Sequence, residues 1–498
     1  MPDLHDLLDR GVPTEPTAPD AEALLRRGLR RRRTKRTAAG AAAVVVLLAG
    51  VTSVVGIVSR PDLPVIGEGP GDASAELSWV PVAESPLTPR ESPRSATDGT
   101  RVVLWGGEAE PAAFESGSTH RDDGAVWDAR TDRWTGLPPA PFSPRLGAHP
   151  RIAGATVVVF GGRPESSLPG ATTAVSTPLM DGAVHDLDTG TWTRIPPAPL
   201  TARTPAAISW DGTELLVWGG ETDQASPRAD GARWTAATGW TRMGEFPLTA
   251  RSGAAIAWDD DRLVVWGGGT DLDPPAGRQE QLVADGAVYD RATDRWTVLP
   301  TAPLSARWFS YGDAQPTARL DGDRVLIAGG ATTQPLEQFR DGAWLDLAAG
   351  TWTPITSAPA DARFVVTDAA GAVAVDDADE TGGTVWTHDE AADRWVRAEV
   401  GQRPSEELPA AAWGRALWSR VSAPEADGAW RPVDVVRPGR DTVAPALDPG
   451  RRVSHIDFSA VVPVDGGVLL WGGMRLTPSG DGFTGDGWTA DGWFLRVP

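Results

Sequence analysis

Six short apolar runs recur along the chain, and each ends in a Gly-Gly pair. They read RVVLWGG, TVVVFGG, ELLVWGG, RLVVWGG, RVLIAGG and GVLLWGG. Their β-branched residues favour strands, and the lack of polar alternation predicts burial on both faces. Glycine permits a tight backbone exit from such a strand. We therefore expect a structural role for Gly106 and Gly107, Gly161 and Gly162, Gly219 and Gly220, Gly267 and Gly268, Gly329 and Gly330, and Gly472 and Gly473.

A second phrase lies between these runs. It opens with Asp-Gly, continues to a Trp, and closes with a Pro-rich loop that ends in Arg. Three near copies are DGAVWDARTDRWTGLPPAPFSPR, DGAVHDLDTGTWTRIPPAPLTAR and DGAVYDRATDRWTVLPTAPLSAR. In six places Trp precedes Arg by 11 positions: Trp79–Arg90, Trp134–Arg145, Trp192–Arg203, Trp240–Arg251, Trp296–Arg307 and Trp352–Arg363.

Each unit predicts four strands. The first follows the Arg, the second is the Gly-Gly run, the third starts at Asp-Gly, and the fourth carries the Trp. The Trp-to-Trp period of 43 to 58 residues indicates a propeller or an array of sheets. Because one such sheet leaves both faces uncovered, the sheets must stack around an axis. Seven tryptophans are expected to pack between them: Trp79, Trp134, Trp192, Trp240, Trp296, Trp352 and Trp395.

The two ends of the repeat region complement each other. SWVPVAESPLTPR, from Ser78, is a fourth strand with no earlier strands before it, and GVLLWGG…DGWFLRV has the earlier strands without a fourth. Pairing of these ends would close the ring and remove its free edges. The number of blades is seven if the weak unit within 401–450, with Trp430 in the fourth-strand role, is an insertion. It is eight if that unit is a blade.

The pattern resembles the kelch repeat, in which a Gly-Gly pair is followed by an aromatic residue and, after six intervening residues, by a Trp. Trp127 and Tyr289 hold the aromatic position in two units, and other units place His185, Arg233, Leu345 or His388 there. The resemblance covers roughly residues 78–400 and 458–498. It implies a β-propeller. Together with the repeat pattern and the apolar run 37–59, the expectation is an all-β, kelch-like β-propeller of seven or eight four-stranded blades with N- and C-terminal strand closure, preceded by one transmembrane helix.

Kelch architecture also hosts a copper radical oxidase of the galactose oxidase type. That activity would require a Cys–Tyr crosslink, a second Tyr and two His ligands. This chain has no Cys, and its tyrosines are Tyr289 and Tyr311. We therefore expect no such chemistry. The absence of Cys also excludes disulfides and Cys-ligated metals.

The N-terminal region predicts a membrane anchor. Residues 37–59 contain no charge and are long enough to span the hydrocarbon core as a helix. RRGLRRRRTKR stands just before this run, so the positive-inside rule places the N-terminus inside. A cleaved signal peptide is the alternative, although its basic and apolar regions are shorter. We expect 1–36 to be a cytoplasmic basic tail, 37–59 a transmembrane helix, 60–77 an extracytoplasmic linker, and 78–498 the propeller.

The net charge of −21 is unevenly distributed, since Lys35 is the only lysine and the residues after 36 are strongly acidic. Such a surface repels phosphates, so we expect no nucleic-acid partner. We also expect no metal and no cofactor. The six histidines His5, His120, His149, His185, His388 and His455 include no close pair. Acidic turns such as WDDDRL and DLDTGTW read as hairpin tips, with calcium ligation or a sialidase-type Asp box as alternatives.

The recurring arginines are the candidate binding residues. Ring symmetry would place Arg90, Arg145, Arg203, Arg251, Arg307 and Arg363 around one mouth of the channel. Arginines near this point line the ligand mouth of kelch domains in ubiquitin-ligase adaptors, so the resemblance suggests an anion or acidic-peptide site. The alternative is that each Arg pairs with an Asp of a neighbouring blade or with a strand-end carbonyl. Loops 108–122, 163–180 and 269–284 break the symmetry and carry the other binding candidates.

These observations favour a membrane-anchored, extracytoplasmic module that binds an unknown protein or glycan ligand, with no catalytic residues assigned. A carbohydrate-active enzyme of epimerase or lyase type is the alternative, and a structural envelope role is a third possibility. Fold alone does not decide among them.

Overall fold

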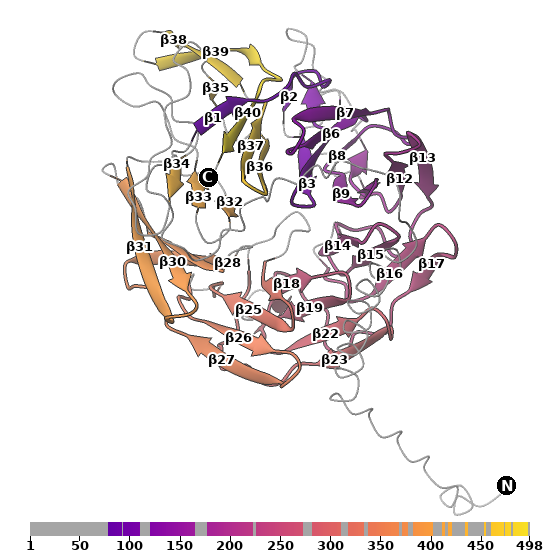
Figure 1. Ribbon diagram of the computed structural model, residues 1–498. Coiled ribbons are helices and arrows are strands. Elements are labelled where there is room, and N and C mark those ends of the chain that lie inside the picture. Colours follow the sequence, from indigo (N-terminus) through magenta and orange to yellow (C-terminus); the bar gives the residue numbers. More distant parts are fainter. Residues whose placement is uncertain are drawn as a thin grey trace, which may run out of the picture. The chain divides into compact units, whose positions relative to one another are not determined.

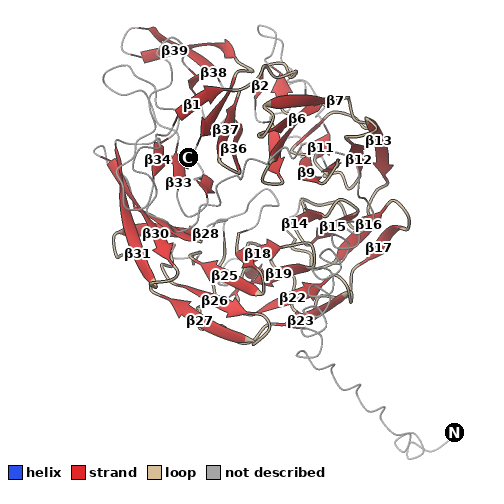
Figure 2. Ribbon diagram, viewed as in Figure 1, coloured by secondary structure: helices blue, strands red, loops and turns tan. Residues whose placement is uncertain are grey.

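The computed structural model describes residues 78–496 apart from 92, 110–119, 165–176, 223–225, 272–280, 310–316, 333–336, 368–370, 377–381, 402–410, 414–416, 421–433, 437–452, 455–459, 473 and 480–481. The predicted tail, transmembrane helix and linker, 1–36, 37–59 and 60–77, lie outside these residues. Within the described part, no helix has the length and apolar character needed to cross a membrane. Strands supply its regular structure (Figure 2).

Seven four-stranded antiparallel sheets stand side by side around a centre in the described part of the chain (Figure 1). Six of them, blades 1 to 6 in chain order, are continuous in sequence. Their inner strands are β3 (Arg94–Thr97), β9 (His149–Ala153), β14 (Ala207–Trp210), β18 (Ala255–Trp258), β24 (Arg319–Asp321) and β28 (Ala362–Thr367). Their second strands are β4 (Arg101–Trp105), β10 (Thr156–Phe160), β15 (Glu214–Trp218), β19 (Arg262–Trp266), β25 (Arg324–Ala328) and β29 (Ala372–Asp376).

The outer half begins at the Asp-Gly step in blades 1 to 5 and at Thr381-Gly382 in blade 6. The third strands are β6 (Gly124–Asp128), β12 (Gly182–Asp186), β16 (Gly231–Thr235), β22 (Gly286–Asp290), β26 (Gly342–Asp346) and β30 (Gly382–Asp389). The outer strands are β7 (Arg133–Leu137), β13 (Thr191–Ile195), β17 (Gly239–Arg242), β23 (Arg295–Val298), β27 (Thr351–Ile355) and β31 (Arg394–Gly401). The predicted four strands per unit are therefore confirmed. They include blade 6, where Asp376 and Asp377 stand in place of the Gly-Gly pair.

The seventh four-stranded sheet, the closing blade, joins the two ends of the described chain. It consists of β36 (Ala460–Val464), β37 (Gly467–Trp471), β40 (Gly492–Arg496) and, as its outer strand, β1 (Ser78–Pro81). β1 pairs antiparallel with β40, with Ser78 opposite Arg496 and Pro81 opposite Trp493. The predicted closure by the N- and C-terminal strands is confirmed.

The weak unit predicted within 401–450 forms a smaller sheet of β32 (Ala411–Trp413), β33 (Leu417–Arg420) and β34 (Asp434–Val436). Trp430, its predicted fourth-strand residue, lies outside the described residues. The propeller thus has seven four-stranded blades and this additional three-stranded sheet. A second three-stranded sheet contains β35 (Val453–Ser454), β38 (Met474–Ser479) and β39 (Gly482–Trp488).

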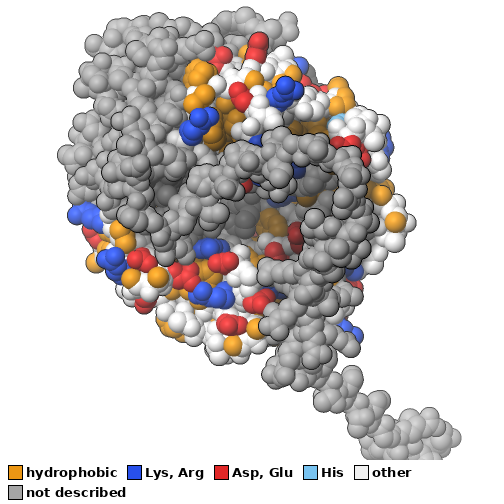
Figure 3. Space-filling model, viewed as in Figure 1, with side chains coloured by type: hydrophobic (Ala, Val, Ile, Leu, Met, Phe, Trp, Pro, Cys, Tyr) orange, Lys and Arg blue, Asp and Glu red, His pale blue; other side chains and the backbone are white. Residues whose placement is uncertain are grey.

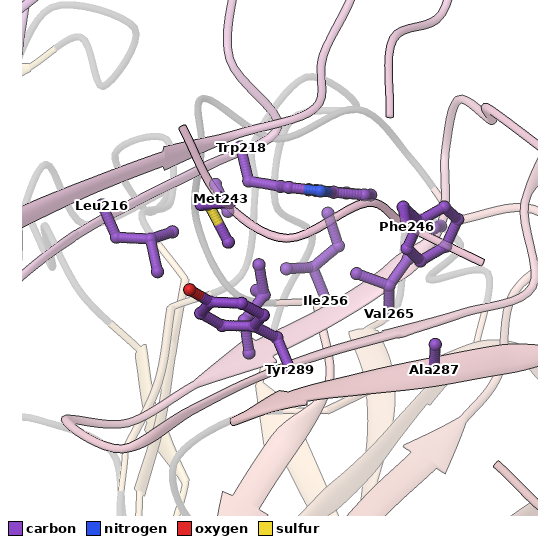
Figure 4. Packing of buried hydrophobic residues seen from close by; sticks show 11 residues of the cluster. Leu216, Trp218, Met243, Phe246, Ile256, Val265, Ala287 and Tyr289 are labelled. Carbon is purple, nitrogen blue, oxygen red and sulfur yellow. The ribbon is translucent and has the colours of Figure 1, made fainter. Parts of the chain in front are cut away.

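The core lies between neighbouring blades. The second strands are buried along almost their whole length, and Trp105, Trp218, Trp266 and Trp471 at their ends are 0–1% exposed. In the cluster between blades 3 and 4, Leu216 and Trp218 of one sheet face Ile256, Val265 and Tyr289 of the next (Figure 4). Full burial of each such side chain contributes roughly 1.5–3 kcal/mol.

The third strands begin with Gly because the end of the second strand lies against them. A Cβ would lie 2.5 Å from Leu104 O on Gly124 and 2.2 Å from Val159 O on Gly182. A Cβ on Gly124 would meet the Trp105 ring at 2.6 Å, and one on Gly286 would meet the Trp266 ring at 2.9 Å. The Gly-Gly pairs have a different reason. Both members take positive φ, for example 63° at Gly219 and 93° at Gly220. A Cβ on Gly220 would also lie 1.9 Å from Thr204 O.

The Trp of each outer strand ties its blade to the blade before it. Trp134 Nε1 donates to Ala83 O at 3.0 Å, across the junction between the closing blade and blade 1. Five equivalent bonds of 2.7–3.1 Å continue around the ring: Trp192 to Pro138, Trp240 to Pro196, Trp296 to Gly244, Trp352 to Pro300 and Trp395 to Thr356. Trp79 lies in β1, and its side chain is outside the described part.

The turn before each of these tryptophans has one of two forms. Blades 1, 4 and 6 place an Asp at positive φ: Asp132, Asp294 and Asp393. Each Asp carboxylate accepts the backbone N–H of the same residue whose carbonyl receives the Trp bond: Ala83, Gly244 and Thr356. Blades 2, 3 and 5 place a Gly there: Gly190, Gly239 and Gly350. In these blades the facing residue is Pro138, Pro196 or Pro300, which has no N–H to satisfy.

One residue of the repeat pattern was placed wrongly from the sequence. Trp234, not Arg233, stands opposite Trp240 in the position that Tyr289 holds opposite Trp296. The reason is that turn 236–238 of blade 3 is one residue shorter than turn 291–294 of blade 4. A one-residue slip moves a side chain to the other face of the sheet, so Arg233 faces blade 4.

Candidate functional site

The three repeat signatures, Arg, Gly-Gly and Asp-Gly, meet at one point in blades 1 to 5. In blade 1, Arg90 Nη1 donates to Gly106 O at 3.1 Å and to Asp123 Oδ1 at 2.7 Å. Arg90 Nε donates to Thr88 O at 3.0 Å. The guanidinium therefore ties the connector that enters the blade to the loop between its second and third strands.

The same arrangement recurs in blades 2 to 5. The shortest Arg–Asp distances are 2.7 Å for Arg145 and Asp181, 2.5 Å for Arg203 and Asp230, 2.7 Å for Arg251 and Asp285, and 2.7 Å for Arg307 and Asp341. The pKa of Asp230 is lowered, because the hydrogen bond and charge of Arg203 outweigh its partial burial. The connector also forms short ladders with the residues after Gly-Gly: β2 (Arg90–Glu91) with β5 (Glu108–Ala109), and β8 (Arg145–Leu146) with β11 (Arg163–Pro164).

The two members of each Arg–Asp pair differ in burial. The five arginine side chains are at most 3% exposed, whereas their aspartates are 30–49% exposed. A buried guanidinium needs a carboxylate partner, which each Asp supplies. The arginines predicted to line the channel mouth are thus inner members of ion pairs, and the carboxylates form the outer surface. A ligand role for them stays a prediction that this geometry does not favour. Arg363 lies in β28, with its side chain outside the described part.

A polar network that breaks the repeat joins blades 3 and 4 on the opposite face. Arg291 Nε donates to Glu214 Oε1 at 2.5 Å, and Arg291 Nη1 lies 3.4 Å from Asp211 Oδ2. Arg233 Nη1 donates to Arg291 O at 2.9 Å. Burial and the negative charges of neighbouring aspartates, Asp211 first among them, raise the pKa of Asp260. Charged side chains of both signs lie close together over the described blades (Figure 3).

Tyr289 is buried behind this network. Its hydroxyl donates to Asp294 Oδ1 at 2.5 Å, and burial together with this bond raises the pKa of Tyr289 far above its usual range. A phenol held protonated and 0% exposed packs in the core. Tyr311 lies outside the described residues.

Four histidines are described, and they lie in different places. His185 is 2% exposed and packs edge-on to Trp192. His388 Nε2 lies 2.9 Å from Asp393 Oδ1. His120 Nδ1 lies 3.5 Å from Glu108 Oε1, and His149 begins an inner strand. No group of three or more His, Cys, Asp or Glu side chains in the described part of the chain is placed to hold a metal.

One arginine on an inner strand also departs from the repeat. Arg151 Nε donates to Ile208 O at 3.0 Å in the next blade, and its Cζ lies 5.9 Å from the Trp258 ring centre. Burial lowers the pKa of Arg151 to about 10, so it stays charged at neutral pH. Arg151 thus links three blades near the axis.

Two further arginines, Arg121 and Arg228, were missed by the sequence reasoning. Each stands two residues before the Asp of an Asp-Gly step, where other blades have Leu179, Val283 and Phe339. Because this position varies, a search for recurring residues passes over it.

Most of the three symmetry-breaking loops, namely 110–119, 165–176 and 272–280, lies outside the described residues.

Comparison with known proteins adds little to this geometry. No family model matches the chain, and no curated protein matches it. A solved structure titled "Structure of YjhT" is similar over 61% of this chain and 99% of that chain, at 15% identity and a TM-score of 0.38. Similarity at that level decides neither fold nor function, so both are argued from this chain. Its strand order, Gly-Gly exits and outer-strand tryptophans define a kelch-like β-propeller.

Proposed function

We propose that this chain is a membrane-anchored, extracytoplasmic binding module, and that the propeller face carrying the connections between second and third strands takes a protein or glycan ligand. The asymmetry between the two faces carries the proposal. On one face the turns are uniformly tight, as in 98–100, 154–155 and 211–213. On the other face the connections are long and unequal, as in 106–123, 161–181 and 219–230.

Uniform turns serve the repeat, whereas unequal loops on a rigid scaffold are where binding residues concentrate. Since the Arg–Asp pairs fix the base of each long connection, the loops are held at defined points around the mouth. A rigid rim with variable loops suits recognition of a macromolecule.

The binding role is tested with a soluble fragment of residues 75–498. We expect capture of a specific envelope protein in a pull-down, or binding to a defined set of structures on a glycan array. Consumption of a sugar by the fragment, followed by NMR, would contradict the binding role and support an epimerase or lyase. Failure to bind in either format would also contradict it.

The anchor is proposed from residues 37–59 and their basic flank. We expect the full chain to sediment with membranes and to resist extraction at high pH, with the propeller accessible to protease from outside. Removal of residues 1–59 should release it. A full chain found in the soluble fraction would overturn this part.

A further inference from the structure

Arg121 and Arg228 hold equivalent positions in blades 1 and 3. Their backbone N–H groups donate to the second Gly of each Gly-Gly pair, at 2.9 Å from Arg121 to Gly107 O and at 2.8 Å from Arg228 to Gly220 O. Leu179, Val283 and Phe339 make the same backbone bond in blades 2, 4 and 5. The backbone of this position is therefore fixed, and only the side chain changes.

Blade 5 shows what a side chain at this position covers. The ring centre of Phe339 lies 3.9 Å from Cζ of Arg307, the buried member of the Arg–Asp pair. In blades 2 and 4 the residue is also apolar. Arg121 and Arg228 thus place a second guanidinium at the position that an apolar residue fills elsewhere.

One nitrogen of each guanidinium, Nε, lacks a hydrogen-bond partner. The Nε atoms of Arg121 and Arg228 are shielded from solvent and have no hydrogen-bond partner, and the structure gives neither side chain an ion pair within the described residues. Both side chains are partly buried, and leaving one shielded N–H without an acceptor costs free energy. Blades 2, 4 and 5 have an apolar residue at the same position, so the fold does not require an arginine there.

Blade 3 has three more polar atoms in this ladder that are shielded from solvent and have no hydrogen-bond partner. They are Arg203 Nη2, Thr222 Oγ1 and Glu221 Oε1. Thr204, Glu221 and Pro227 face one another in successive bridges. Because side chains alternate along a strand, the neighbouring residues Arg203, Thr222 and Arg228 share the opposite face of this ladder. Asp230 is already occupied by Arg203 and, at 3.5 Å, by Arg242.

We propose that Arg228, together with Thr222 and Arg203, forms a binding site for the carboxylate and a hydroxyl of an acidic sugar, and that Arg121 supplies an equivalent carboxylate contact in blade 1. The inference deepens the proposed binding function and rests on it. A guanidinium binds a carboxylate through two parallel hydrogen bonds. A sugar hydroxyl both donates and accepts, so it satisfies Thr222 and Arg203 together. An acidic peptide side chain offers the carboxylate without that hydroxyl, so the sugar is favoured.

The test uses isothermal titration calorimetry on the 75–498 fragment with oligomers of galacturonate and of glucuronate. Their neutral methyl esters are the matched ligands. Arg121→Leu and Arg228→Leu are the variants, since Leu179 already occupies this position in blade 2 and the change is compatible with the fold. We expect each variant to weaken binding by at least about tenfold, the double variant to abolish it, and the methyl esters not to bind.

A second readout separates a binding role from a structural one. If the two arginines are unpartnered in the free protein, the leucine variants should match or exceed the melting temperature of the parent. A fall in melting temperature would show that the arginines support the fold, and would overturn the site. So would equal binding of the esters, unchanged affinity of both variants, absence of uronate binding, or tighter binding of a glutamate-rich peptide. Retention of a neutral glycan or protein ligand by the double variant would keep the proposed function and reject this site.

Discussion

Arginine plays opposite parts in this protein, depending on what lies within reach of its guanidinium. Arg251 is 1% exposed and donates to Asp285 at 2.7 Å, so its charge is balanced inside the fold. Arg228 is partly buried and has no such partner among the residues that the structure describes. Some arginines are therefore held in ion pairs that support the fold, whereas others could contact a ligand. Burial and hydrogen-bond partners distinguish the two groups, and recurrence in the sequence does not.

Breaking one repeat ion pair should destabilise the propeller. Asp285→Ala leaves the Arg251 guanidinium buried without its acid. Because Asp285 is about half exposed, water screens part of the loss, and we expect roughly 1–3 kcal/mol of lost unfolding free energy. Urea denaturation of the 75–498 fragment measures it. Asp188→Ala, which removes an exposed acid with no ion pair in the described part, is the control. Equal stability of the two variants would contradict a structural role for the pair.

His185 should make stability depend on pH. Burial is the main reason why the pKa of His185 is lowered, so the folded protein holds the ring neutral. The unfolded chain binds a proton below about pH 6.5, so stability falls as pH decreases through that value. We expect His185→Phe to flatten the stability profile between about pH 6.5 and 5. Thermal melts across this interval check it, and an unchanged slope would show that another group dominates.

At the scale of the element, the turn before each outer-strand Trp shows that two residues far apart in sequence are chosen together. Asp132 accepts from Ala83 N–H at 3.0 Å and from Trp127 Nε1 at 2.9 Å. Where the facing residue is a proline, that N–H does not exist, and a glycine takes the left-handed position without strain. The contact between neighbouring blades thus has two consistent forms. In one an Asp faces a residue with an N–H, and in the other a Gly faces a Pro.

This pairing predicts a coupled double mutant at the junction of the closing blade and blade 1. Asp132→Gly removes the acceptor of the Ala83 N–H, and Ala83→Pro removes that N–H. We expect each single change to cost roughly 1–2 kcal/mol, and the double change to cost less than their sum by about 0.5–1 kcal/mol. Chemical denaturation of the four proteins gives the coupling energy. Strict additivity would mean that the two forms are independent.

The whole molecule depends on one short strand. β1 supplies the outer edge of the closing blade, and the Trp134–Ala83 bond follows directly after it. A fragment of residues 82–498 would expose the edge of β40, which invites pairing with another chain. We expect this fragment to melt at least several degrees lower than 75–498 and to aggregate, as seen by light scattering. A monomeric 82–498 fragment of equal stability would show that closure does not depend on β1.

The sequence predicted the architecture well, because every strand signal repeats and repeats correct one another. Four strands per unit, the Asp-Gly starts and the meeting of Ser78 with the C-terminal strand all follow from pattern alone. It failed where a single residue changes the outcome. The shorter turn of blade 3 moved Arg233 to the other face, and nothing in spacing shows that Arg90 meets Asp123 with the arginine on the inside.

The candidate site was the least predictable part, for a physical reason. A ligand contact must be unlike its counterparts in other blades, so it has no recurring signal. Arg121 and Arg228 become visible only when their unbonded Nε atoms are compared with the contact that Phe339 makes with Arg307 in blade 5. A position-by-position comparison of the blades, looking for a charge at an otherwise apolar place, is the sequence signal that would have found them.

The pairing of β1 with β40 also sets the order of events during synthesis. Ser78 leaves the ribosome long before its partner Arg496 is added. β1 therefore waits, with its hydrogen-bonding edge unused, until the other blades have appeared. Such a distant contact is slow to form. A ribosome that stalls within the last blade would release a ring with one open joint.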